Sequence, residues 1–239
     1  MLKQLIVSLT ILRYPKQNIW KALLAMALHR RYMAQQAGCT FYKLMGSGKN
    51  GTFDTKPDWQ QWAVLAVWDD RDSFDAFYRD SEVAKWWDKY QVEKWTILLS
   101  PLQSHGKWDG KEPFGKPNAT IPAGPVAVLT RATIRFTRLK YFWANVAGVA
   151  NLMAAAHGFI ASFGIGEAPL YRQATFSVWE SLDDVKAFAY GSQEHAAVIK
   201  KTRDEKWYAE ELFARFSIID AFGTLNGADP LKDHLNLKA

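Results

Sequence analysis

The sequence predicts an α+β protein in which two tandem ferredoxin-like units, each with the order βαββαβ, pack as an intramolecular dimeric α/β barrel. The first observation is an internal repeat: a shift of 111 positions places AVLAVWDDRDSFDAFYRDSEVAKWW on ATFSVWESLDDVKAFAYGSQEHAAV. The second is that VSLTILRY lies over LTRATIRF at a slightly larger offset. A ferredoxin-like unit covers one face of its sheet with helices, so two copies can bury their open faces against each other.

Each element of the first unit has its own signal. KQLIVSLTILRY alternates and is rich in β-branched residues, which predicts a strand. The next segment has apolar residues at helical spacing and ends at Gly38, a typical helix stop. CTFYKLM and WAVLAVW predict two more strands, and an Asp-capped segment, DDRDSFDAFYRDSEVAKWWDKY, predicts a second helical region. WTILLSPL completes the unit as its fourth strand.

The second unit repeats this order from VAVLTRATIRF to FARFSIIDAF. We therefore place the units at 1–105 and 124–225, with a Gly- and Pro-rich linker at 106–123 and a tail at 226–239. GSGKNG and FGIG are interpreted as turns in which glycine adopts a positive φ. A dinucleotide-binding loop is not predicted, because no helix start follows GSGKNG.

Composition limits the classes of function. The chain has 239 residues, of which 49% are hydrophobic and 23% charged, as in globular proteins. The net charge of +6 is scattered, which argues against nucleic acid but permits peripheral contact with an anionic membrane. No apolar stretch is long enough to span a bilayer. We expect a cytoplasmic protein, at most peripheral to the inner membrane.

Motifs of hydrolases and metal chelates are missing. The sequence has no G-x-S-x-G, C-x-x-C or H-E-x-x-H, and its five histidines have no chelating spacing. Aromatic residues make up 14% of the chain, which fits either a large core or a site for a flat or long apolar ligand.

Chemistry is expected where the two copies differ. His195 stands where the first copy has Ala84, and a heme needs only one protein ligand, commonly His. A surface or core role for His195 is the alternative. His157, which replaces Ala37, is the reserve candidate, and Cys39 is interpreted as a small buried residue rather than a thiolate ligand.

The first strand of the second copy differs as well. Our alignment places Arg131 over Leu9, and strand alternation puts Arg131, Thr133 and Arg135 on one face. Two arginines on one face could hold the propionates of a heme or polarise a bound ligand. An ion pair between the units, or a solvated edge, explains them equally well.

Several long segments resemble the spheroidene monooxygenase family. They are FYKLMGSG, GPVAVLTRATIR, FGIGEAP, QATFSVWESL and EHAAVIKKTRDEKWYAEELFARF, and the resemblance runs from about Phe41 to Pro230. It implies a heme b-dependent monooxygenase that oxidises an apolar, carotenoid-like substrate with O₂ and an electron donor. Related folds would be those of aldoxime dehydratases and heme-degrading monooxygenases.

The resemblance also implies residue roles. His195 would be the iron ligand, and Arg131 the catalytic residue opposite it. Cofactor contacts would come from Lys43, Arg131, Arg135, Phe176, Trp179, Arg203 and Trp207, and further matching positions are Gly164, Gly166 and Glu167. Ser162 departs from the lysine expected there, which leaves the substrate open. A heme enzyme of another class, such as an aldoxime-dehydratase-like enzyme or one acting on an N–O substrate, and a non-catalytic heme-binding protein are the alternatives.

Overall fold

A computed structural model describes the chain at residues 4–49, 54–115, 117, 124–191, 201–202 and 204–235. Its first half contains β1 (Ile6–Arg13), η1 (Lys16–Asn18), α1 (Ile19–Ala34), β2 (Cys39–Gly48), β3 (Pro57–Trp68), α2 (Arg71–Asp80), α3 (Glu82–Tyr90) and β4 (Glu93–Gly106). Its second half contains β5 (Val126–Ile134), η3 (Phe136–Arg138), α4 (Leu139–Ala154), β6 (Phe159–Ala168), β7 (Arg172–Trp179), α5 (Leu182–Gly191) and β8 (Tyr208–Gly223).

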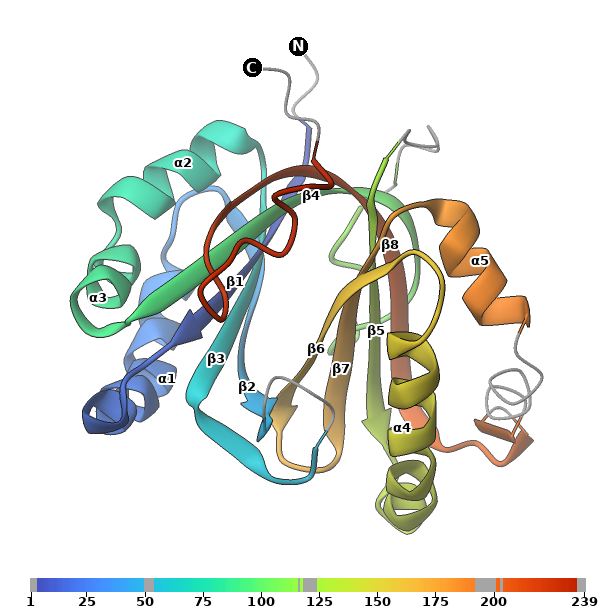
Figure 1. The fold of residues 1–239 in the computed structure, drawn as a ribbon. Coiled ribbons are helices and arrows are strands. Elements are labelled where there is room, and N and C mark those ends of the chain that lie inside the picture. Colours follow the sequence, from blue (N-terminus) through green and yellow to red (C-terminus); the bar gives the residue numbers. More distant parts are fainter. Residues whose placement is uncertain are drawn as a thin grey trace.

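The strands close into one antiparallel barrel in the order β1-β3-β2-β6-β7-β5-β8-β4. Helices α1 to α3 lie outside the barrel on one side, and α4 and α5 lie outside it on the other (Figure 1). The two halves meet along the long β4–β8 ladder and at a short contact in which Gly46 pairs with Gly166 and Ser47 with Ile165. The predicted closed barrel is therefore confirmed.

Inward-facing side chains fill the barrel, as the alternating strand patterns require. Leu9, Leu65, Leu129 and Phe176 all belong to one buried cluster inside it. The cluster also holds Trp108 and Phe114, from the segment that we expected to be a linker. Residues 107–115 thus form a short hairpin from which only Trp108 and Phe114 enter the core, because burial stabilises their large aromatic side chains.

The strand ladders correct our alignment of the two halves. Ile6 pairs with Trp68 and Val126 pairs with Trp179, so the matched tryptophans make Ile6 and Val126 equivalent, 120 positions apart. By this register Arg131 is equivalent to Ile11, and the predicted match with Leu9 was wrong. A slip of two residues preserves the inside–outside alternation of a strand, so pattern alone does not detect it.

The glycines of GSG and FGIG are also placed differently from the prediction. Gly46 and Gly48 lie in β2, and Gly164 and Gly166 in β6, and none of the four has a positive φ. A Cβ on Gly166 would approach the carbonyl oxygen of Arg172 to 2.8 Å. Glycine is needed there because the neighbouring backbone comes too close for a side chain.

His29 of α1 is a buried histidine of the first half, with only 2% of its surface exposed. The rings of Trp86 and Trp87 lie 5.8 and 6.4 Å from it, and its Nε2 has no hydrogen-bond partner. Burial lowers the pKa of His29 from 6.5 to about 4, because the apolar surroundings disfavour the imidazolium.

We expect His29 to make the protein acid-sensitive. The pKa of His29 is lower in the folded than in the unfolded protein. The stability that depends on neutral His29 is therefore fully present above about pH 6.5 and is lost as the pH falls towards 4. Replacing His29 with Leu should reduce the loss of unfolding free energy between pH 7 and 4 by about 3 kcal/mol. Urea unfolding at both pH values measures this, and identical losses in the two proteins would contradict it.

Candidate functional site

The Arg131 side chain lies inside the barrel and is only 1% exposed. Its Nη1 donates a hydrogen bond to Glu210 of β8, and its Nη2 lies 3.4 Å from Oε1 of Glu167 on β6. The guanidinium carbon is also 5.4 Å from the ring centroid of Trp108. A buried guanidinium is stable only when carboxylates surround it in this way.

Lys43 joins the same group from the other half of the barrel. Its Nζ lies 2.8 Å from Oε2 of Glu167 and is also paired with Asp109. Trp108 Nε1 donates a 2.6 Å hydrogen bond to Glu167, and Arg172 Nη1 lies 3.6 Å from Asp109. We call these residues the barrel ion cluster: Lys43, Arg131, Arg172, Asp109, Glu167 and Glu210.

Two carboxyl groups of the barrel ion cluster have lowered pKa values. Burial alone would raise the pKa of Asp109, but the hydrogen bond from Lys43 and the charges of Lys43, Arg172 and Arg131 outweigh it. Burial would likewise raise the pKa of Glu210, but hydrogen bonds from the backbone N–H groups of Gly110 and Asp109 and from Arg131 lower it. The carboxylates are thus held ionised as partners of the buried cations.

The arrangement predicts a structural role for Arg131. Replacing it with Met should lower the free energy of unfolding by about 3–5 kcal/mol, because Glu210 and Glu167 lose their buried partner. Chemical denaturation measures the loss. Arg79→Met is the control, since Arg79 and Asp80 form an exposed pair, and it should change stability little. A stable Arg131→Met variant would contradict a structural role.

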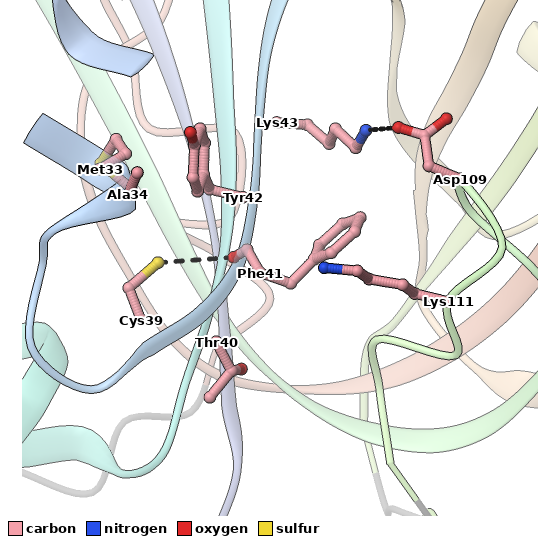
Figure 2. A pocket seen from close by; sticks show the side chains of 9 residues that line it. All are labelled: Met33, Ala34, Cys39, Thr40, Phe41, Tyr42, Lys43, Asp109 and Lys111. Carbon is pink, nitrogen blue, oxygen red and sulfur yellow. Dashed lines mark hydrogen bonds and ion pairs between the residues drawn. The ribbon is translucent and has the colours of Figure 1, made fainter. Parts of the chain in front are cut away.

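A pocket of about 320 Å³ lies beside the barrel ion cluster, between the end of α1, β2 and the 107–115 hairpin. Figure 2 shows Lys43 reaching from β2 towards Asp109 at one side of it. Cys39 also lines the pocket, and its Sγ lies 3.5 Å from the carbonyl oxygen of Phe41. Burial raises the pKa of the Cys39 thiol to about 12, so it is not a thiolate at neutral pH.

The outer face of the second half's sheet is more polar than that of the first half. Gly164, Thr175 and Thr130 lie side by side across β6, β7 and β5. The equivalent row of the first half is Leu44, Val64 and Thr10. In the next row Gln173 and Ala132 replace Trp62 and Leu12. We call the second-half residues the outer platform: Thr130, Ala132, Gly164, Gln173 and Thr175.

Burial differs between the halves in the same place. In the first half Leu44, Val64 and Thr10 are buried beneath the helices, whereas Thr130 of the outer platform is exposed. The facing helices differ too: Ala25 and His29 of α1 are buried, but the equivalent Asn145 and Val149 of α4 are only half-buried. The centre of α4 therefore packs less closely on the sheet than α1 does, although Ala132 and Gly164 of the outer platform are buried.

The predicted cofactor contacts fall on opposite faces of the barrel wall. Lys43, Arg131 and Phe176 point inwards. Trp179 packs outside against Phe188 of α5 at 5.1 Å, and Trp207 packs with Phe142 of α4. Arg135 is exposed, and its Nε donates to the carbonyl of Tyr208. One planar group cannot touch both sets, because the sheet separates them.

The principal predicted ligand cannot be placed, since His195 and Arg203 lie outside the described residues. His157 is exposed at the end of α4, and its Nδ1 is 2.7 Å from Asp184. That hydrogen bond raises the pKa of His157. Within the part of the chain that the structure describes, no three His, Cys, Asp or Glu side chains are grouped as a metal site.

Comparisons with known proteins identify the family. No family model matches the chain. It is 34% identical to a spheroidene monooxygenase of Cereibacter sphaeroides over 235 residues, which cover 97% of this chain and 72% of that protein. The chain belongs to the spheroidene monooxygenase family. A member from Rhodobacter capsulatus is 33% identical over 95% of both chains, so the expected oxidoreductase class is supported as well.

Solved structures support the fold alone. An aldoxime dehydratase crystallised with butyraldoxime has a TM-score of 0.60 at 13% identity, covering 92% of this chain and 80% of that one. A second aldoxime dehydratase structure also has a TM-score of 0.60, at 12% identity, covering 98% of this chain and 89% of that one. None of the described helices is long and apolar enough to cross a membrane.

Sequence reasoning missed half of the barrel ion cluster. Asp109 was assigned to a linker, and neither Glu210 nor Arg172 was predicted as a site residue. One available signal was the alternation of β8, in which Glu210 shares a face with buried Leu212 and Ala214. For Asp109 the only signal was the neighbouring Trp108, an unusual residue for an exposed linker.

Proposed function

We propose that the protein is a heme b-dependent monooxygenase that oxidises an apolar, carotenoid-like substrate with O₂ and electrons from a donor protein or reductant. Family membership supports the oxygenase class and the kind of substrate. The observation that carries the cofactor assignment is the outer platform, which lacks the large apolar side chains of its first-half counterparts Leu12, Leu44 and Trp62.

The described residues fit a planar apolar group on this face. Gly164 and Ala132 present almost no side chain, although both are buried, and Thr130 beside them is exposed. Phe142 and Trp207 supply apolar wall at one end of α4. His195, in the chain after α5, would be the iron ligand, and Arg135 and Arg203 would pair with the propionates.

A bound heme would supply the redox chemistry that activates O₂. The chain's own groups would orient the reactants. The hydroxyls of Thr130 and Thr175 lie next to each other and can donate hydrogen bonds to a polar atom held at the platform. Arg131 and Lys43 act from the opposite face, where we assign them to holding the barrel wall rigid beneath the platform.

We also infer that each half is a ferredoxin-like unit. The strand order is β4-β1-β3-β2 in the first half and β8-β5-β7-β6 in the second, and the helices follow equivalent strands. Only the second unit would bind the cofactor, because the matching face of the first is filled by its own helices.

The purified protein, supplied with hemin, tests the proposed function. We expect one heme per chain, a Soret band that shifts with an acyclic carotenoid, and ¹⁸O from ¹⁸O₂ in the product only when reductant is present. Heme binding without turnover would indicate a carrier. Dehydration of an aldoxime without O₂ consumption would indicate the other enzyme class. Either result would overturn the proposal.

A further inference from the structure

The outward face of α1 carries an exposed apolar stripe. Trp20, Leu24, Leu28 and Tyr32 recur every four residues and are 56, 39, 39 and 43% exposed. Leu23 lies beside them and is 46% exposed. We call these five residues the α1 stripe. Large apolar side chains usually face a core, yet here the opposite side of the helix already packs on the barrel.

The equivalent helix of the second half has no such stripe. Three of the five positions, taken 120 residues later in α4, are Lys140, Ala144 and Gly148, all exposed; the other two, Trp143 and Leu152, are half-buried. The fold therefore does not require large apolar residues on this surface. Their presence on α1 calls for a partner outside the chain.

Charge indicates the kind of partner. From Lys16 to Ala34 the sequence contains Lys16, Lys21, Arg30 and Arg31 and no acidic residue. Lys21 Nζ lies 3.8 Å from the ring centroid of Trp20 and 4.7 Å from that of Tyr90, which gathers aromatic rings and a cation at one end of the helix.

We propose that the α1 stripe docks onto an anionic lipid bilayer, with α1 lying in the plane of the interface. In such a helix the basic residues bind the anionic headgroups and the apolar face enters the boundary with the acyl chains. Trp and Tyr are enriched at this interface. A second copy of the chain is a poorer occupant, because two identical faces would bring their cations together. The inference does not depend on the proposed heme.

The location is compatible with access to the rest of the molecule. Figure 1 places α1 on the outside of the barrel, opposite α4 and α5. A protein docked through α1 therefore keeps the whole second half, including the outer platform, free of the docking surface. This separates the docking test from any test of cofactor binding.

Vesicle flotation of the full-length chain tests the proposal. We expect binding to vesicles containing anionic phosphatidylglycerol, weaker binding in 0.5 M NaCl, and little binding to pure phosphatidylcholine. Leu24→Glu with Leu28→Glu should weaken binding at least about tenfold. The matched control, Ala144→Glu with Gly148→Glu, introduces the same charges at the equivalent positions of α4 and should bind like the parent protein.

Circular dichroism and thermal melting establish that both double variants are folded. Equal binding by the two double variants would overturn the proposal, as would equal binding of the parent protein to neutral and anionic vesicles. Sedimentation velocity tests the other occupant: a dimer that the α1 substitutions dissociate, without vesicle binding by the parent protein, would show that a second copy covers the α1 stripe.

Discussion

Replacing His195 with Ala is expected to abolish heme retention, leaving less than about a tenth of the heme bound by the parent protein. A five-coordinate heme has one protein ligand, so its loss removes the only covalent link to iron. Heme content after gel filtration and the Soret spectrum measure the effect. Added imidazole should restore part of the spectrum, because it can occupy the vacated position.

Two other histidines make this test specific. His234→Ala should bind heme normally, since His234 lies in the C-terminal segment after β8. His157→Ala tests whether His157, the reserve candidate, is the heme ligand instead of His195. The His157 side chain is exposed and paired with Asp184. An unaltered spectrum in the His195 variant, together with heme loss in the His157 variant, would transfer the ligand role to His157.

Filling the outer platform should exclude heme without unfolding the protein. Thr130→Leu combined with Thr175→Leu introduces two larger apolar side chains at neighbouring positions of the platform. We expect heme affinity to fall by more than about tenfold, because added methyl groups would occupy the space of a planar ligand. Titration with hemin, followed by Soret absorbance, measures the affinity.

Thr224→Leu is the matched control, since Thr224 is exposed just after β8 and lies outside the platform. The heme affinity of the Thr224→Leu variant should equal that of the parent protein. Normal heme binding by the double variant would exclude the outer platform as the heme-binding site. The pocket beside Lys43 and Asp109 would then be the next site to test.

Much of the fold could be predicted because its signals are local. Alternating apolar and polar residues predicted strands at β1 and β5, and apolar residues at helical spacing predicted α1. The repeat around Trp68 and Trp179 indicated two similar halves. The register between the halves could not be predicted to the residue. Arg131 was matched to Leu9 instead of Ile11, since either choice keeps the same face inwards.

The candidate site was predictable only in part. Alternation predicted that Arg131, Thr133 and Arg135 share a face, but β5 ends at Ile134 and Arg135 lies exposed beyond it, so the prediction was wrong for Arg135. Alternation also does not say which face points into a barrel whose outer surface is also covered. Arg131 was therefore expected at the cofactor, whereas it faces Glu167 and Glu210 inside the barrel. The opposing carboxylates come from strands far apart in sequence.

The sequence by itself determined the duplication, the order of strands and helices, the family, and which copy carries His195. Each of these depends on residue identity along the chain. Only the tertiary structure decided that Trp108 packs inside the barrel, that Lys43 meets Glu167, and that Thr130 is exposed whereas its counterpart Thr10 is buried. Those outcomes depend on barrel closure, which brings together residues that no local pattern relates.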